Sequence, residues 1–319
     1  MYNGIPKEAV KMEENKSSLT ARVSAFSRAY HAKKYEVKVF NDTIAEKLLT
    51  VEEYNTTAQN MARGIAYFNP EFQGTPEEAL EFVVSQQLAP STVGRSAFTE
   101  SKLEEAVKKE GIKQYCIFAA GFDSFAYRQP EWAKELEIFE IDHPATSEDK
   151  QNRVKTFCNE EIKNLSYIKA DFTISKWEKA LLEHEKYKDN VLSFCSVLGI
   201  SYYLTREDFE KLIEIISKSV AKGSKIIFDY PVISEIEEET DQVKRQKALA
   251  KKAQEGMQAE YSKEEMEQLL MKYGFKVVEH LIPNEITERF FSAYNNAKPL
   301  YSMRAFDKVN YCYASLETR

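Results

Sequence analysis

Residues 114–150 read QYCIFAAGFDSFAYRQPEWAKELEIFEIDHPATSEDK, and this segment carries the strongest fold signal in the chain. An apolar run from Tyr115 to Ala119 leads into a turn around Gly121. A second apolar run, Leu136 to Ile141, ends on Asp142, about twenty residues after the turn. Two apolar runs joined in this way are typical of the βαβ unit that binds nucleotides.

Two residues of this stretch have the properties that a nucleotide site requires. Gly121 has backbone freedom and no side chain, so the chain can pass close to a ligand there. Asp142 lies at the carboxyl end of its strand, where an acidic residue accepts hydrogen bonds from ribose hydroxyls in dinucleotide folds. The segment AAGFDS is not GxGxxG, so the glycine pattern alone equally permits an ordinary connection between a strand and a helix.

Two motifs taken together point to a family. FAAGFDSFAYR (118–128) followed by FEIDHPATSEDK (139–150) closely resembles the leucine carboxyl methyltransferase-like family. Members of that family are S-adenosylmethionine-dependent O-methyltransferases, and the bacterial ones are often described as acting in polyketide biosynthesis. In the family, an LGAGxDTRAYR-like turn is followed by an ExDxP strand end. The resemblance implies S-adenosylmethionine as cofactor, bound at the turn by Ala119, Ala120 and Gly121 and at the strand end by Asp142 and His143.

The composition limits the possible partners. The 319 residues could form one large domain or two small ones, and the single set of motifs favours one catalytic domain with additions. The content of 43% hydrophobic and 12% aromatic residues is ample for a sizeable core. The formal net charge is -7, with no basic stripe or patch of interleaved aromatic and basic residues, so we expect no nucleic-acid partner.

The cysteines and the N-terminus indicate the cellular compartment. The four cysteines have no CxxC spacing, which favours a reduced protein over a disulfide framework or a zinc site. The first 16 residues contain no apolar signal-peptide core, and no later run approaches about 18 uninterrupted apolar residues. We therefore expect a soluble, cytoplasmic protein with no bound metal and no membrane partner.

The N-terminal part of the sequence predicts a helical cap. Ser17 to His31 has apolar residues at helical spacing and resembles the KxSxTAxxxAxxRAxH signature of the family, in which N-terminal helices cover the cofactor and the substrate. The resemblance makes Arg22, Arg28 and His31 candidates for that cover, although a plain packed helix has the same pattern. A further helix is predicted to open at Thr75, whose side chain can form a capping box with Glu78.

Arg95 is the predicted catalytic arginine. It lies in STVGRSAFTE, which we expect to connect to a helix from Thr99 to Glu110. A lone surface arginine is usually a solvated charge, but the resemblance implies that Arg95 contacts the carboxylate of the cofactor or of the substrate. A guanidinium can hold a carboxylate with two parallel hydrogen bonds, which both binds and orients it.

Two later strand ends supply the remaining candidates. Asp171 and Phe172 follow a short strand, Tyr167 to Lys169, and the resemblance places them beside the adenine, Asp171 as acceptor for the amino group and Phe172 as an apolar face. A plain turn would also explain Asp171. At the next strand end the family reads EGxxxYLxxE, with the glutamate near the cofactor. This chain has Leu198 at that position, which the resemblance makes a cofactor-binding candidate, and it retains Tyr203. The Tyr203 hydroxyl could position a substrate oxygen, or the ring could simply be buried.

The order of apolar runs predicts the fold class. KIIFDY (225–230) reads as a fifth strand with Asp229 at its carboxyl edge, and two later strands, near 275–282 and 305–314, complete the sheet. We expect an α/β fold with a Rossmann-like, seven-stranded, doubly wound methyltransferase sheet and an N-terminal helical cap. The antiparallel direction of the last two strands is implied by the resemblance. We expect residues 1–98 to form the cap and residues 99–319 the domain that binds S-adenosylmethionine, with the two parts making one compact unit.

The sequence therefore predicts an S-adenosylmethionine-dependent O-methyltransferase that acts on a carboxylate or hydroxyl of a small molecule. A carboxylate acceptor is already ionised and needs no base, so Arg95 would aim it and Tyr203 would hold its other oxygen. A phenol or alcohol would need a base, for which His31 and His143 are candidates.

Two alternatives remain open at this stage. A nicotinamide-dependent oxidoreductase is compatible with the strand, turn and acidic strand end, but GxGxxG is missing. A binding protein that has lost activity is compatible with Ala119 in place of the usual glycine and with Leu198 in place of the usual glutamate. The acceptor and the oligomeric state do not follow from the sequence.

Overall fold

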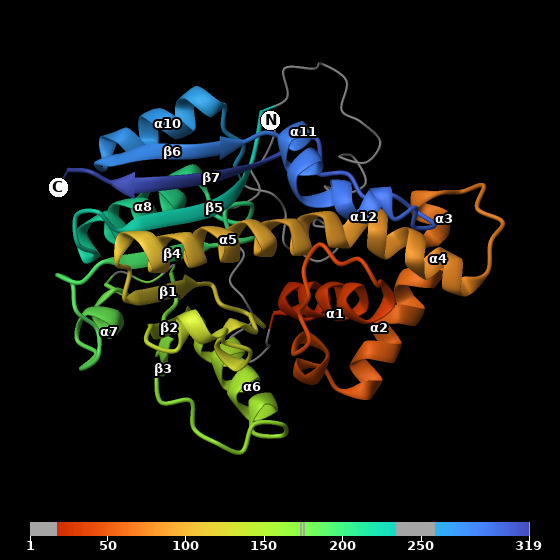
Figure 1. The fold of residues 1–319 in the computed structure, drawn as a ribbon, viewed down its shortest axis with the longest axis horizontal. Helices are drawn as coiled ribbons and strands as arrows, with labels where there is room; N and C mark the ends of the chain where they lie inside the picture. The colour runs from red at the N-terminus through yellow and green to blue at the C-terminus, as the bar shows by residue number, and fades with distance from the viewer. Residues whose placement is uncertain (1–17, 173, 175, 234–258, 319) are drawn as a thin grey trace, which may run out of the picture.

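A computed structural model describes residues 18–318 except positions 173, 175 and 234–258. It contains a seven-stranded sheet with the order β3-β2-β1-β4-β5-β7-β6 (Figure 1). The strands are β1 Gln114–Phe118, β2 Glu137–Asp142, β3 Leu165–Lys169, β4 Ser193–Val197, β5 Lys225–Pro231, β6 Phe275–Leu281 and β7 Val309–Leu316.

The sheet has the direction pattern that the sequence predicted. Strands β1 to β5 pair in parallel, and β7 runs antiparallel to both β5 and β6. In the register, Phe118 at the end of β1 lies beside Ile141 of β2 and beside Val197 at the end of β4. The carboxyl ends of these strands therefore meet at one edge of the sheet, and the predicted fold class is confirmed.

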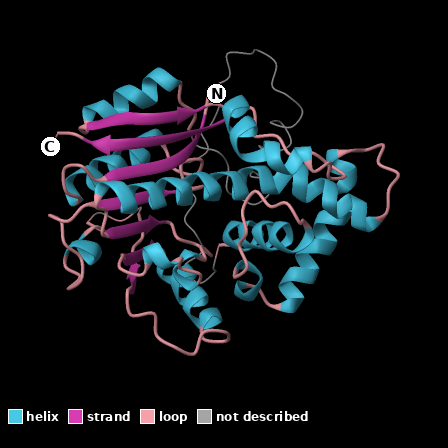
Figure 2. Cartoon of the chain, viewed as in Figure 1, coloured by secondary structure: helices cyan, strands magenta, loops and turns pink. Residues whose placement is uncertain are grey.

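Helices cover both faces of the sheet, as Figure 2 shows. In Figure 1, the helices of the N-terminal part gather beyond one end of the strands, next to α11 and α12. The longer helices are α1 Leu19–Lys34, α2 Val51–Arg63, α4 Pro76–Val83, α5 Ala89–Glu110, α6 Pro144–Val154, α8 Arg206–Ser219 and α10 Lys263–Lys272. The shorter helical segments include η1 Ala45–Leu48, α3 Ile65–Phe68, η2 Val84–Leu88, α7 Lys179–Leu182, α11 Pro283–Ile286, η5 Thr287–Phe291 and α12 Ser292–Asn296.

Strand alternation divides the core into two layers. Because neighbouring residues of a strand point to opposite faces, Tyr115 and Ile117 pack into a different apolar cluster from Cys116 and Phe118. The first cluster includes buried residues of α1 and α5, and the second includes buried residues of α8 and α10. The sheet is therefore buried on both sides, which explains the continuous apolar runs in its sequence.

Local sequence signals fix several helix starts. Thr75 accepts a hydrogen bond from the backbone of Glu78 at 3.2 Å, and the Glu78 carboxylate accepts one from the backbone of Thr75 at 2.8 Å, as predicted. Thr50 and Glu53 form a second capping box before α2. Each such box satisfies backbone N–H groups that a helix start otherwise leaves unpaired.

The prediction for residues 95 to 99 was wrong in one respect. The helix begins at Ala89, not at Thr99, so Arg95 lies within α5 and not in a connection. A Cβ atom on Gly94, within this helix, would lie 2.8 Å from the Tyr311 hydroxyl, so this glycine makes room for a neighbour. The expected boundary between residues 98 and 99 falls inside the same helix, and the division into two parts remains a prediction.

Candidate active site

The candidate site is centred on the turn after β1. The Asp142 carboxylate, at the end of β2, accepts hydrogen bonds from the backbone N–H of Gly121 and, at 2.6 Å, from that of His143. Burial raises the pKa of Asp142, while these two hydrogen bonds oppose the rise. The structure thus joins the two motifs that the sequence analysis treated as a pair.

The backbone of this turn is left-handed at two positions. Gly121 has φ +50° and Ala119 has φ +53°, a conformation that favours glycine. A Cβ atom on Gly121 would lie 3.2 Å from Cβ of Ala21, on α1. The space that the sequence analysis assigned to a ligand is therefore bordered by the N-terminal helix, so Gly121 also permits the cap to approach.

His143 shapes the start of α6. Its Nδ1 atom accepts a hydrogen bond from the backbone of Ala145 at 3.3 Å, so the side chain caps the helix. Pro144 occupies the first helical position, where its missing N–H has no cost. His143 can therefore shape this turn without contacting a ligand, and a contact between His143 and the cofactor stays a prediction.

The third strand end brings an aromatic cluster beside Asp142. The backbone N–H of Ala170 donates to the Asp142 carbonyl at 2.8 Å, so Asp171 and Phe172 follow directly at the same edge. The Phe172 ring lies 4.8 Å from the ring of Trp177, centroid to centroid and edge to face. Trp177 was not predicted as a neighbour of this strand end, because it carries no motif in the sequence.

Arg95 reaches the same edge from α5. Its Nη1 atom lies 3.2 Å from Oδ2 of Asp229, at the carboxyl end of β5. Asp229 is fully buried and also accepts hydrogen bonds from the Gly199 backbone at 2.7 Å and from the Tyr202 hydroxyl at 2.9 Å. The structure therefore assigns Arg95 a protein partner that the predicted site did not include.

The guanidinium of Arg95 packs directly on the loop after β4. A Cβ atom on Gly199 would lie 2.5 Å from Nη1 of Arg95, so a side chain there would displace the guanidinium from its present position. Leu198 is half-buried in the same loop. Burial alone would lower the pKa of Arg95, but the Asp229 carboxylate raises it, so the group stays charged.

Tyr202, rather than Tyr203, bonds to the pair of Arg95 and Asp229. Tyr203 is half-buried and packs against the first core cluster, its ring 6.2 Å from that of Tyr202. The role of Tyr203 toward an acceptor therefore stays a prediction. Tyr202 and Tyr203 are adjacent in the sequence, and no local pattern indicates which of the two bonds to Asp229.

The cap residues predicted to cover a ligand bind protein groups. Arg22 pairs with Glu53 at 3.4 Å, and Arg28 pairs with Asp42 at 2.8 Å. His31 is fully buried, and its Nε2 atom accepts a hydrogen bond from the backbone of Val39 at 2.9 Å. Burial lowers the pKa of His31 to about 4, so it is neutral at pH 7 and holds the chain after α1.

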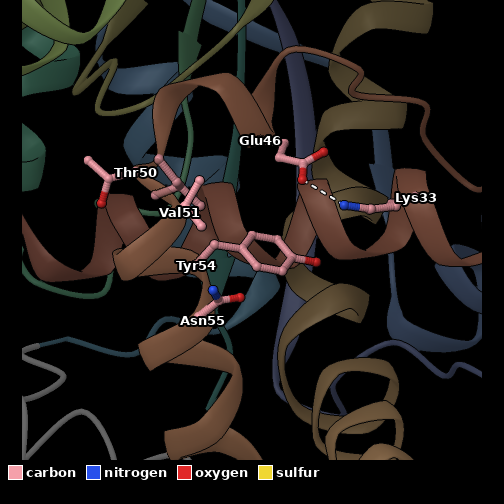
Figure 3. Close-up of a pocket in the computed structure, with 7 residues that line it drawn as sticks. Lys33, Glu46, Thr50, Val51, Tyr54 and Asn55 are labelled. Atoms are coloured by element: carbon pink, nitrogen blue, oxygen red, sulfur yellow. Dashed lines mark hydrogen bonds and ion pairs between the residues drawn. The ribbon is translucent and has the colours of Figure 1, made fainter.

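A surface cavity lies elsewhere on the cap. Figure 3 shows this cavity of about 200 Å³ between α1, η1 and α2, with Lys33 and Glu46 paired at 2.8 Å on one side and Tyr54 on another. It is separate from the carboxyl edge and contains none of the predicted site residues. We therefore assign it no role in the chemistry.

Within the described part of the chain, no group of three or more His, Cys, Asp or Glu residues is arranged to hold a metal ion. Among the same residues, no helix is both long and apolar enough to cross a membrane.

Comparison with known proteins identifies the family. A sequence model described as leucine carboxyl methyltransferase matches residues 21–217. The chain belongs to this family. The matched region contains Arg95, the Gly121 turn, Asp142, Asp171 and the loop with Leu198, so the leucine carboxyl methyltransferase motifs coincide with the candidate site.

Relatives and solved structures agree with this family. A protein of Bacillus subtilis (strain 168), YktD, named as a predicted S-adenosyl-L-methionine-dependent methyltransferase, is 36% identical over 309 residues, which cover 95% of this chain and 99% of YktD. A relative from Mycolicibacterium paratuberculosis is also named as a predicted S-adenosyl-L-methionine-dependent methyltransferase. It is 28% identical over 177 residues, which cover 55% of this chain and 56% of the relative.

Two solved structures share the fold at low sequence identity. One is a predicted methyltransferase from Thermobifida fusca, with a TM-score of 0.57 and 12% identity over 96% of this chain and 97% of its own. The other, from Streptomyces avermitilis, has a TM-score of 0.58 and 11% identity over 95% of this chain and 98% of its own. The predicted family is thus confirmed, and the prediction of S-adenosylmethionine as cofactor agrees with the names of the relatives.

Proposed function

We propose that this chain transfers the methyl group of S-adenosylmethionine to a carboxylate oxygen of a small-molecule acceptor. The observation that carries the proposal is the bonding of Gly121 to Asp142 at the carboxyl ends of β1 and β2, in a chain of the leucine carboxyl methyltransferase family. Family membership favours this donor over the nicotinamide alternative.

The residues at the edge suit the chemistry of the donor. Each oxygen of Asp142 accepts one backbone hydrogen bond and retains a lone pair, which can accept from a ribose hydroxyl. Phe172, which is half-buried and packs edge to face on the buried Trp177, offers apolar ring surface at the same edge. An arginine can bind a carboxylate of the ligand, and an aromatic face can pack against an adenine ring.

Arg95 is the candidate for orienting the acceptor. Among the described residues it makes hydrogen bonds only through Nη1, to Asp229 and, at 3.5 Å, to Ser91, so Nε and Nη2 are not committed to these partners. Asp229 and Gly199 fix the guanidinium before a ligand arrives. Such a fixed cation binds a carboxylate at little cost in side-chain ordering.

A carboxylate acceptor requires the fewest groups. The donor supplies an electrophilic methyl on a sulfonium, and an ionised carboxylate attacks it without losing a proton. A hydroxyl would need a base, but His31 is buried under the chain at Val39 and His143 caps α6. We therefore favour the carboxylate over the hydroxyl. A polyketide-type acceptor stays a prediction from the resemblance, and a cytoplasmic location stays a prediction from the cysteines and the N-terminal sequence.

Calorimetric titration with S-adenosylmethionine and, separately, NAD tests the donor. We expect binding of S-adenosylmethionine that weakens at least about tenfold in Asp142→Ala, since hydrogen bonds to a charged group are lost. Glu148→Ala removes an exposed carboxylate from α6 and serves as the matched control, with unchanged affinity. Binding of NAD instead, or no loss in Asp142→Ala, would contradict the proposed donor site.

Turnover then separates an enzyme from an inactive binding protein. Small carboxylates and phenols are incubated with labelled S-adenosylmethionine, and label is measured in the product. We expect methyl esters from a carboxylate and their loss in Arg95→Met. Methylation of phenols alone would contradict the choice of acceptor, and donor binding without any transfer would favour the inactive alternative.

A further inference from the structure

Charged side chains join the N-terminal helix to the turn after β1. Arg28, on α1, donates from Nε to Asp42 at 2.8 Å and from Nη2 to the Phe122 carbonyl at 2.6 Å. Arg128, just after that turn, lies 3.5 Å from the same aspartate and donates to both oxygens of Glu100, on α5. We call Arg28, Asp42, Arg128 and Glu100 the cap network.

The cap network is shielded from water. The Asp42 side chain is 0% exposed, and those of Arg28 and Arg128 are 9% and 14% exposed. Burial alone would raise the pKa of Asp42, but the two guanidinium groups lower it. Asp42 also accepts hydrogen bonds from the backbone of Ile44 and Ala45, which fixes the start of η1. Loss of one member would leave an unpaired buried charge.

Arg28 contacts the turn immediately beside the candidate donor site. Phe122, whose carbonyl it binds, follows Gly121, and the N–H of Gly121 donates to Asp142. Ala21, on the same helix as Arg28, borders Gly121 itself. Helix α1 therefore holds the turn through one apolar contact and one charged hydrogen bond.

The partners of Arg28 distinguish it from a ligand-binding residue. Its third nitrogen, Nη1, donates to Ser24 at 2.8 Å, so all three nitrogens have partners within the protein. The family resemblance made Arg28 a candidate for direct cover of the cofactor. The geometry instead directs its whole guanidinium into the protein.

We propose that Arg28 is a positioning residue for the methyl donor. It holds residues 121–124 so that Gly121 and Asp142 present their donor-binding geometry, and it does so without touching the donor. The inference rests on the proposed function, because the donor is the ligand whose affinity Arg28 sets.

The conservative variant Arg28→Lys gives the sharpest test. A lysine has one ammonium in place of the planar fork, so it can pair with Asp42 but cannot also reach the Phe122 carbonyl in the same geometry. We expect a melting temperature near that of the wild type and an affinity for S-adenosylmethionine about tenfold weaker, from the loss of one charged hydrogen bond. At saturating donor, kcat should stay within about twofold, because the acceptor groups are untouched.

A double variant guards against a simple stability effect. Arg28→Met with Asp42→Asn removes both charges of the pair, so no uncompensated carboxylate stays buried. We expect it to show the same loss of donor affinity as Arg28→Lys. Lys33→Met is the control, since Lys33 lies on the same helix but pairs with Glu46 at the surface. Donor affinity within twofold of wild type in both Arg28 variants would overturn the proposal.

Hydrogen exchange tests the same inference without any donor. Amide exchange of residues 121–124, followed by mass spectrometry on the free protein, should be faster in Arg28→Lys than in the wild type and in Lys33→Met. If the wild type binds no S-adenosylmethionine, the proposed function is wrong, but the exchange rates still test whether Arg28 holds the turn. Unchanged exchange of the segment would overturn the positioning role.

Discussion

At the residue scale, Asp229 shows why a site residue is easier to see in space than in sequence. It takes hydrogen bonds from Arg95, Gly199 and Tyr202, which come from a helix, a loop and the turn that follows it. A fully buried carboxylate is costly unless it is paired and hydrogen-bonded, and this one is both. Its place at a strand end was predictable from KIIFDY, but its partners were not.

His31 gives a prediction for the pH dependence of stability. Its pKa is about 4 in the folded protein, below the ordinary value of 6.5, because burial disfavours the charged form. The unfolded chain therefore binds more protons between these two values, so stability is complete above pH 6.5 and falls as the pH drops toward 4. A shift from 6.5 to about 4 corresponds to about 3 kcal/mol in the free energy of unfolding.

His280, whose pKa burial also lowers to about 4, contributes a second loss with the same sign. Burial raises the pKa of Glu140 to about 7, which acts in the opposite direction over part of this range, but that group is the same in both proteins. We therefore expect His31→Gln, which can still accept from Val39, to lose less stability than the wild type between pH 6.5 and 4. Urea unfolding at several pH values measures the slope. Equal slopes for the two proteins would mean that His31 does not resist protonation.

At the element scale, the same backbone signal has different meanings at different helix ends. Gly111 ends α5 with φ +77°, and Gly274 follows α10 with φ +81°, so both have the left-handed conformation of a helix cap. A Cβ atom on Gly111 would meet nothing within 4 Å, whereas one on Gly274 would overlap the carbonyl oxygen of Thr318. Sequence alone predicts the conformation but not the space.

These two glycines make a matched pair for mutation. We expect Gly111→Ala to lower the free energy of unfolding by about 1 kcal/mol, from backbone conformation alone. Gly274→Ala should cost about 2 kcal/mol more, because the chain after β7 must shift and weaken its two hydrogen bonds to the Gly274 carbonyl. Chemical denaturation of both variants checks the difference, and equal losses would contradict the steric argument.

At the scale of the whole molecule, the cap and the sheet share one core. The first apolar cluster contains Phe26 and Val93 from the N-terminal part together with Ile117 and Ile227 from the sheet. The cap network adds a buried ion pair across the same two parts, between Asp42 and Arg128. A division at residue 98 separates the two sets of sequence motifs, but the apolar core is continuous across it.

A truncated chain tests this shared core. A fragment of residues 99–319 begins inside α5 and exposes the face of the sheet that Phe26 and Val93 cover. We expect it to lack a cooperative thermal transition in circular dichroism, since much of its core would lie open to water. The full chain serves as the control. A fragment that melts cooperatively would support two independently folding domains.

The strands, the turn and the family were predictable from local signals in the sequence. Apolar runs, Gly121 and Asp142 are local signals, and the parallel order followed from strands that alternate with helices. Only the tertiary structure decided that Arg95 lies in a helix and pairs with Asp229, 134 residues away, and that Arg28 binds the Phe122 carbonyl, 94 residues away. The physical reason is that a local pattern sets backbone shape, whereas the partner of a buried charge depends on which distant segment folds against it.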